Sequence, residues 1–224
     1  MNVNTQYPST SFGTNIKFVS PKDFQAVRLK YPIRNFVLGY TLSPKAKNST
    51  KCYRINKNKC FTQGIRTCIG INIADLENKT SSFFAHLFHS AKNYNNLNLT
   101  KPLIKGNNAV IIGKRQDDYA FSSEILNKLL NFCNDAKLKT TKLCGLKYGY
   151  EADMAYDGNS DSLFVCVSKI NNKKKYVSKQ ERLKYAFKNI SIASCDNVQF
   201  IKEGSLDTDN KFMKFLYSIY SCIR

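Results

Sequence analysis

The sequence contains no Trp and only two His, and only 16 of its 224 residues are acidic. Basic residues number 35, so the formal net charge is +19. This imbalance predicts attraction to an acidic protein, to nucleic acid or to an anionic membrane. The alternative interpretation is that the charges form a solvated surface without a specific partner.

Metal-binding patterns are also missing. None of the eight Cys forms a CxxC pair, and two His are too few for the usual zinc-finger spacings. Asp153, Asp157 and Asp161 lack the glycine and the terminal Glu of a calcium loop, so we expect a solvated turn there. We therefore expect neither a metal nor another cofactor, and the irregular Cys spacing favours reduced thiols.

Long hydrophobic segments are absent as well. No stretch approaches the length of apolar residues that a transmembrane helix needs. The polar start of the chain, MNVNTQYPSTSFGTN, lacks the apolar core of a secretory signal. We therefore expect a soluble protein, for which any export would use a route other than a cleaved signal peptide.

The distribution of polar and apolar residues predicts the domain organisation. Residues 1–14 are expected to form a flexible polar tail. Residues 15–50 are expected to form an N-terminal extension, because apolar runs at 16–19 and 36–42 are separated by Pro21 and Pro32. The loop-like segment SPKAKNSTK precedes the expected catalytic domain, 51–224.

Short β-prone runs dominate that domain, and we expect strands at 52–55, 68–74, 82–88, 109–112, 143–150, 162–170 and 198–201. Helical spacing of apolar residues predicts helices at 120–138 and 212–220. The capping-box sequence Ser178-Lys-Gln-Glu181 predicts a further helix that includes Leu183 and Phe187. Without regular βαβ alternation, the pattern favours an α+β fold, with a mixed or antiparallel sheet core flanked by helices.

Cys68 and His86 are the residues best placed for nucleophilic catalysis. A hairpin over 68–74 and 82–88 brings Cys68, at the beginning of one strand, near His86, towards the end of the next. The thiol then has an imidazole that can take and return its proton. Gly64 permits a tight or left-handed turn before Cys68, whose backbone N–H is the expected oxyanion donor. The alternatives are a structural cysteine beside an ordinary histidine, and His89, which is the weaker candidate for the base.

The spacing around these residues resembles CheD, the chemoreceptor glutamine deamidase family, and more remotely the catalytic domain of the cytotoxic necrotizing factors. In CheD a Thr lies six residues before the nucleophilic Cys in a T-x-G-x-x-[ST]-C-type stretch, and an A-H pair follows on the next strand. This chain has Thr62-Gln-Gly-Ile-Arg-Thr-Cys68 and Ala85-His86. The segment NNAVIIGKR also resembles a stretch of that family, so the resemblance covers about residues 59–170. Where the family usually has a Gly before the small residue that precedes Cys, this chain has Arg66 before Thr67. This difference bears on the identity of the substrate more than on the chemistry.

The resemblance implies a sandwich-like CheD fold and a protein-glutamine deamidase with a Cys68–His86–Thr62 triad. Cys68 would attack the side-chain amide of a protein glutamine, His86 would transfer the protons, and Thr62 would orient the imidazole. The expected substrate is a protein with an exposed glutamine and an acidic surface.

The expected location is the bacterial cytoplasm, or a host cell that the protein enters as a secreted effector. Three alternatives are open: transglutamination at the same site, a cysteine protease, and a basic nucleic-acid-binding module without catalysis. Because no nucleic-acid-binding motif is recognisable, we expect no nucleic acid partner.

Overall fold

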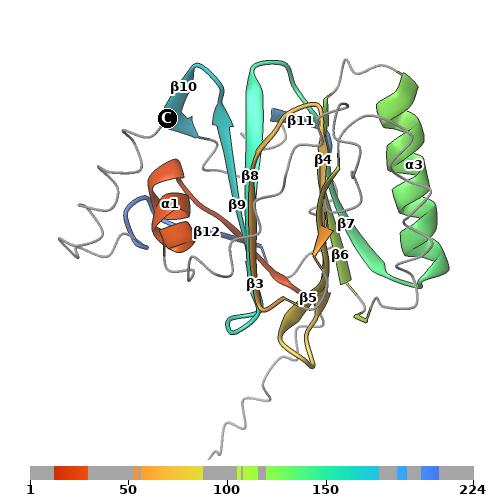
Figure 1. The fold of residues 1–224 in the computed structure, drawn as a ribbon. Coiled ribbons are helices and arrows are strands. Elements are labelled where there is room, and N and C mark those ends of the chain that lie inside the picture. Colours follow the sequence, from red (N-terminus) through yellow and green to blue (C-terminus); the bar gives the residue numbers. More distant parts are fainter. Residues whose placement is uncertain are drawn as a thin grey trace, which may run out of the picture.

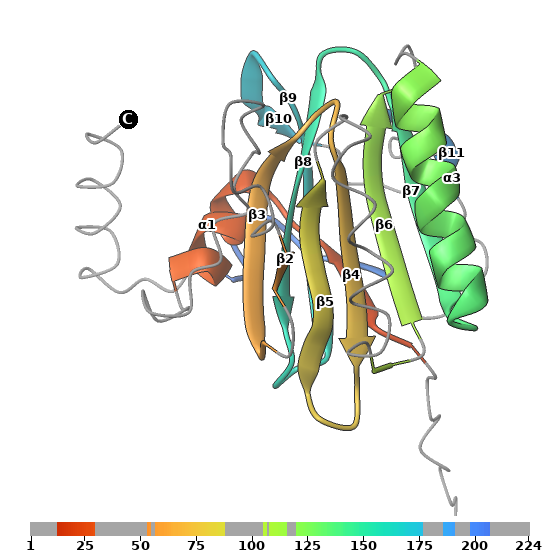
Figure 2. The ribbon, with the colours of Figure 1, turned by 45° about the vertical axis from the view of Figure 1, so that its right-hand side comes forward.

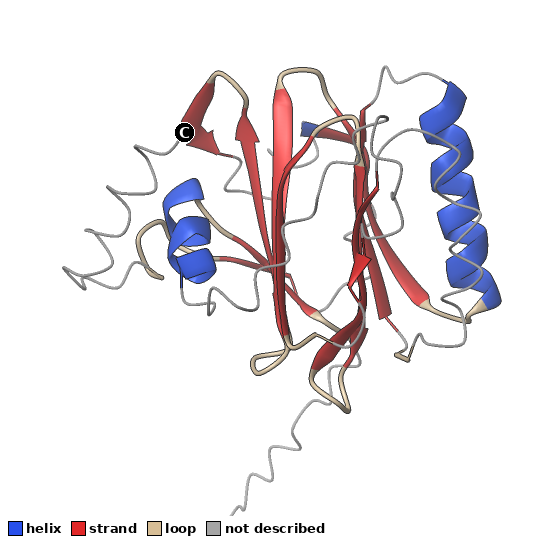
Figure 3. Ribbon diagram, in the orientation of Figure 1, coloured by secondary structure: helices blue, strands red, loops and turns tan. Residues whose placement is uncertain are grey.

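Two β-sheets face each other in the computed structural model, which describes residues 13–29, 53–54, 57–87, 105–106, 108–115, 120–176, 186–190 and 198–206. One described helix covers the outer face of each sheet, so the layers follow the order helix, sheet, sheet, helix (Figure 1). Strands make up most of the described elements (Figure 3). The expected α+β class, with mixed sheets flanked by helices, is confirmed.

The first sheet has the strand order β12-β1-β9-β8-β3, and β10 pairs with β9. Its strands are β1 (Asn15–Phe18), β3 (Lys59–Ile65), β8 (Tyr150–Asp157), β9 (Ser162–Lys169), β10 (Asn172–Tyr176) and β12 (Val198–Phe200). β1 runs parallel to both of its neighbours, whereas β8 is antiparallel to β3 and to β9.

The second sheet has the strand order β11-β7-β6-β4-β5-β2. Its strands are β2 (Tyr53–Arg54), β4 (Ile69–Asp75), β5 (Thr80–Leu87), β6 (Asn108–Arg115), β7 (Lys139–Leu146) and β11 (Phe187–Ile190). β4 is antiparallel to β5 and to β6, which confirms the expected hairpin. β6 runs parallel to β7 because the intervening chain crosses over through α3 (Ala120–Asp135), which packs on this sheet (Figure 2).

The N-terminal part of the described chain belongs to the first sheet. β1 lies between β9 and β12, so residues 15–18 of the expected extension share a sheet with strands of the expected catalytic domain. The expected division at residue 50, the apolar run at 36–42, residues 1–12 of the tail and the helix at 212–220 all lie outside the described residues.

A helix occupies the segment that separates the two apolar runs of the expected extension. It is α1 (Pro21–Leu29), and Pro21 suits its first turn because the missing N–H has no helical partner to lose. Ser20 caps the helix: its Oγ accepts the backbone N–H of Asp23 at 3.1 Å and donates to Asp23 Oδ2 at 2.6 Å. No helix in the described residues is long and apolar enough to cross a membrane.

One strand was not predicted, and two expectations need correction. The segment 59–65 had no predicted element and forms strand β3. The single strand expected at 143–150 is divided between β7 and β8 by a turn at Tyr148 and Gly149, and Gly149 has a φ of 82°. Phe187, expected in a helix, begins β11 and pairs with Leu146, so sheet pairing overrides its helical spacing. The capping box at 178–181 lies outside the described residues.

The pleat of β4 and β5 divides their side chains between two cores. Ile71 of β4 and Phe83 of β5 pack in the cluster that contains the apolar face of α3. Phe84 packs in the cluster between the two sheets, together with Met154 of β8. Because alternate residues of a strand share a face, His86 also points between the sheets.

Candidate active site

Thr62 and His86 meet between the two sheets. Thr62 lies on β3 and His86 on β5, and 2.7 Å separates Thr62 Oγ1 from His86 Nδ1. The two residues are buried, at 1% and 2% exposure. Cys60 and Phe84, each two positions earlier on its strand, belong to the core between the sheets. This hydrogen bond therefore links the two sheets and fixes the imidazole ring.

Burial determines the protonation state of His86. Desolvation lowers the pKa of His86 to about 4, because the imidazolium loses its hydration in the core. The ring is therefore neutral near neutral pH. Its Nε2 atom is buried and has no hydrogen-bond partner among the described residues. The 2.7 Å contact fits either tautomer, and in the one whose Nδ1–H donates to Thr62 Oγ1, Nε2 is the ring atom that can accept a proton.

Cys68 stands directly before β4, forms no disulfide and is 5% exposed. Two residues later, Gly70 is the partner of His86 across the β4–β5 ladder. Gly70 and His86 face the space between the sheets, where a Cβ atom on Gly70 would meet Ile65 and Met154, and Cys68 lies in the bend at 66–68 that leads into this end of the ladder. Of the three predicted site residues, the structure joins Thr62 and His86 directly and places Cys68 at the end of the same ladder.

A β-bulge shapes the chain ahead of Cys68. The pairing of β3 with β8 shifts between Thr62 and Ile65, so Gln63 and Gly64 together face Asp153. Gly64 has a φ of 72°, and its N–H donates to Asp153 Oδ1 at 2.7 Å. The expected left-handed geometry at Gly64 is confirmed, although it lies within a strand. Asp153 lies within β8 and not in the solvated turn expected from the sequence.

A salt bridge anchors the bend that carries Cys68 from one sheet to the other. Arg66 Nε and Nη2 each lie 3.0 Å from Glu151 Oε2. The Glu151 side chain is 4% exposed, whereas that of Arg66 is 51% exposed. Two carboxylates of β8, those of Glu151 and Asp153, therefore hold the segment that leads into Cys68.

The sequence interpretation missed this role of β8. Asp153 was expected in a solvated turn and not as a calcium ligand, and no role was predicted for Glu151. The alternation of these two acids with Ala152 and Met154 is typical of a strand with one polar face, but it does not indicate which distant residues the acids bind.

The backbone of β6 approaches Cys68 closely at Gly113. A Cβ atom on Gly113 would lie 2.4 Å from the carbonyl oxygen of Cys68 and 2.6 Å from Ile65 Cγ2. Gly113 also has a φ of 107°, which disfavours other residues. The position of Cys68 therefore depends on a glycine in the neighbouring strand.

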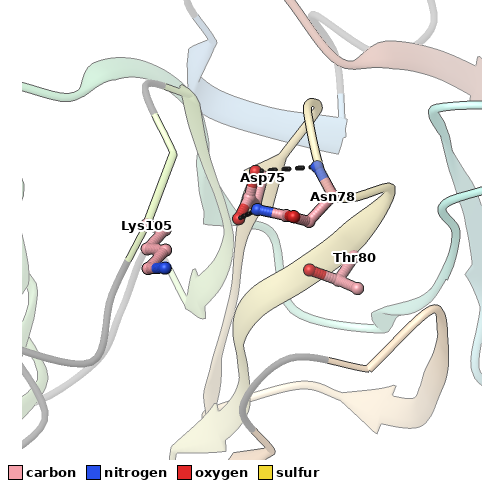
Figure 4. A pocket seen from close by; sticks show the side chains of 4 residues that line it. All are labelled: Asp75, Asn78, Thr80 and Lys105. Carbon is pink, nitrogen blue, oxygen red and sulfur yellow. Dashed lines mark hydrogen bonds between the residues drawn. The ribbon is translucent and has the colours of Figure 1, made fainter.

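A pocket of about 250 Å³ lies at the other end of the β4–β5 hairpin (Figure 4). Its lining consists of Asp75, Asn78, Thr80 and Lys105, and the Asp75 carboxylate accepts hydrogen bonds from Asn78 N at 3.1 Å and Nδ2 at 2.7 Å. Asp75 ends β4 and Thr80 begins β5, so the hairpin separates this pocket from Cys68. No group of three or more potential metal ligands occurs among the described residues.

Comparison with known proteins places this chain in no family: no protein-family model matches it, and no curated protein matches it either. The site is therefore interpreted from its own geometry and from the spacing of Thr62, Cys68 and His86.

Proposed function

We propose that the protein is a cysteine-dependent protein-glutamine deamidase with Cys68 as nucleophile and His86 as general base. The buried hydrogen bond between Thr62 Oγ1 and His86 Nδ1 carries the proposal. It gives the base a fixed orientation and leaves Nε2 for proton transfer. His86 belongs to the β4–β5 ladder, which begins directly after Cys68. An orienting group, a base and a nucleophile are the parts that thiol-dependent acyl transfer requires.

The reaction begins from a neutral imidazole. Because the pKa of His86 is about 4, an imidazolium is not available at neutral pH to stabilise a Cys68 thiolate in advance. Nε2 of His86 takes the thiol proton as Sγ attacks the side-chain amide carbon of a substrate glutamine.

The proton then returns in two stages. The imidazolium of His86 gives its proton to the departing amine, which leaves as ammonia while Cys68 holds the acyl group as a thioester. Water attacks the thioester, His86 takes a proton from it, and the Cys68 thiol is restored as glutamate is released. The mechanism requires the tautomer in which Nδ1–H donates to the Thr62 hydroxyl, and this hydrogen bond holds the ring orientation while Nε2 gains and loses its proton.

Mass spectrometry of a protein library incubated with the enzyme tests the proposal. We expect the mass gain of Gln-to-Glu conversion with wild-type protein and with Cys133→Ala, which removes a buried thiol from the α3 side of the second sheet. Cys68→Ala and His86→Ala should give no conversion. Equal conversion by wild type and Cys68→Ala would contradict the assignment of the nucleophile.

A primary amine added to the same reaction distinguishes hydrolysis of the thioester from its aminolysis. If water is the acceptor, the glutamate product dominates in the presence of a fluorescent alkylamine. If the labelled amide dominates and still depends on Cys68, the protein is a transglutaminase. Cleavage of the peptide backbone that depends on Cys68 would instead indicate a protease.

A further inference from the structure

Three chain connections meet at the end of the sandwich that holds Cys68 (Figure 1). They are residues 66–68 after β3, 147–149 before β8, and 170–171 after β9. They lie together because β8 pairs antiparallel with both β3 and β9. The backbone N–H of Ile170 donates to the carbonyl of Gly149 at 2.8 Å, which ties two of the connections to each other. This end of the molecule is therefore one continuous edge.

The side chains on this edge are basic and aromatic. The Arg66 side chain is half exposed, Tyr148 is 78% exposed, Lys169 is exposed and Lys147 is half-buried. The Lys169 ammonium lies 5.8 Å from the centre of the Tyr150 ring. The three connections contain no Asp or Glu. We refer to Arg66, Lys147, Tyr148 and Lys169 as the basic rim.

The two acidic residues of β8 nearest to the basic rim already have partners within the chain. Glu151 is bound to Arg66, and Asp153 accepts the N–H of Gly64. Charges of both signs occur at the other end of the sandwich, where the turn at 76–79 contains Glu77 and Lys79 and the turn at 158–161 contains Asp161. Among the described residues, therefore, the charged side chains in the connections at the Cys68 end are all basic, whereas those in the connections at the other end are of both signs.

We propose that the basic rim binds an acidic segment of the protein substrate next to the target glutamine. This inference rests on the proposed function, since it specifies the substrate class of the same site. Arg66 lies two residues before Cys68 and is fixed by Glu151, so positive charge and the nucleophile share one connection. Tyr148 adds an exposed aromatic ring of the kind that often anchors protein partners.

A polypeptide fits the basic rim better than a nucleic acid strand does. Sequence-independent binding of single strands uses several aromatic side chains on which successive bases stack. Tyr148 is the one strongly exposed large hydrophobic residue in the described part of the chain. One exposed ring with a few cations suits a short acidic segment.

Binding of labelled peptides to the Cys68→Ala protein tests this inference. Two peptides each contain one glutamine, flanked by Asp and Glu in the first and by Lys in the second, and a single-stranded oligonucleotide of the same charge as the acidic peptide is the third probe. We expect the acidic peptide to bind about tenfold more tightly than the basic one, with a difference that shrinks as salt is added.

Charge reversal locates the preference. We expect the double variant Lys147→Glu, Lys169→Glu to lose most of the preference for the acidic peptide. Tyr148→Ala should weaken the binding of both peptides severalfold. The matched control is Lys105→Glu with Lys139→Glu, which makes the same charge change with exposed side chains at the other end of the sandwich. The control should keep most of the preference, and thermal melts confirm that each variant is folded.

Three results would overturn the inference: no preference between the peptides, an equal loss in the control variant, or tighter binding of the oligonucleotide. The proposed function fails separately. An acidic preference without any Cys68-dependent deamidation would contradict the catalytic proposal and leave the rim intact. Deamidation of both peptides at equal rates, with equal binding, would contradict the rim and leave the catalytic proposal intact.

Discussion

Thr62 and His86 form a 2.7 Å hydrogen bond across the boundary between the two sheets, so the orientation of one side chain depends on the packing of both sheets. The hydroxyl and the imidazole are each buried, and the two residues belong to strands that do not pair with each other. The contact is therefore a sensitive point for both stability and activity.

Thr62→Val removes the hydroxyl and keeps the side-chain shape. Because Nδ1 of His86 then loses its partner in the core, we expect the free energy of unfolding to fall by about 1–3 kcal/mol. The deamidation rate should fall about a hundredfold, since the imidazole is no longer held in place. Urea unfolding and single-turnover assays measure the two effects. Thr62→Ser, which keeps the hydroxyl, is the control, and a Val variant as active as Ser would show that the hydroxyl has no positioning role.

His86 makes the folded state sensitive to acid. Its pKa is lowered from 6.5 to about 4 on folding, so between these pH values the unfolded chain binds a proton that the folded chain does not. This contribution to stability is complete above pH 6.5 and is lost as the pH falls toward 4. Between about pH 7 and pH 5 we expect a loss of about 2 kcal/mol from this residue.

Denaturant unfolding at several pH values, compared between wild type and His86→Gln, isolates that contribution. His86→Gln should have a flatter dependence on pH than wild type. If His86→Gln and wild type lose stability equally on acidification, the imidazole is not buried as a neutral group.

The same pKa sets the acid limb of the pH–rate profile. The base must be neutral to take the Cys68 proton, and His86 is neutral above a pH of about 4. We therefore expect kcat/KM to be independent of His86 titration near neutral pH and to fall tenfold per pH unit below about pH 4. Initial rates on a glutamine peptide measure this, with folding checked at each pH. An acid limb centred on the pKa of a solvated histidine would contradict a neutral buried base.

Glu151→Gln tests the anchor of the Cys68 segment. The substitution keeps the shape of the side chain but removes the charge that binds Arg66, so we expect a loss of about 2 kcal/mol in stability. The matched control is Glu124→Gln on α3, where Glu124 Oε1 and Lys128 Nζ lie 2.7 Å apart in an exposed i,i+4 pair. That control should change stability by less than about 0.5 kcal/mol. Equal effects at the two sites would show that burial adds nothing to the Arg66–Glu151 pair.

Gly113→Ala and Gly64→Ala separate steric from conformational effects near the nucleophile. Both glycines have positive φ, but a Cβ at Gly64 meets nothing within 4 Å, whereas one at Gly113 meets the Cys68 carbonyl at 2.4 Å. We expect Gly64→Ala to lose about 1–2 kcal/mol from backbone strain. Gly113→Ala should lose more and should also lower the reaction rate, because Cys68 must move. Thermal melts and rate measurements on both variants provide the comparison.

The sequence predicted local structure better than long-range pairing. The β4–β5 hairpin, α3 and β9 have patterns that a short window reveals, and they lie close to their expected places. Strand β3 was missed because its partner β8 lies far along the chain and because the bulge at Gln63–Gly64 interrupts its alternation. Phe187 was misassigned because its spacing from Leu183 suits a helix, whereas its pairing with Leu146 is a tertiary contact.

In the candidate site, too, local relationships could be predicted from the sequence and long-range contacts could not. The register of Cys68 and His86 follows from a hairpin, so sequence reasoning could reach it. The contact between Thr62 and His86 was expected only from a family resemblance, because the two residues belong to different sheets. Glu151 and Asp153 act on a segment more than 80 residues earlier in the chain, and no local pattern could indicate that contact.

The parallel placement of β1 between β9 and β12 has a kinetic consequence. The first sheet joins residues 15–18 to residues 162–165 and 198–200, so it cannot be completed until the chain has been synthesised as far as residue 200. The β4–β5 hairpin needs only neighbouring residues and can form early. Thr62 reaches its place through β8, whereas His86 is already in the hairpin. The base and its orienting hydroxyl therefore come from parts of the chain with different folding times, and on the ribosome the candidate site would be assembled late.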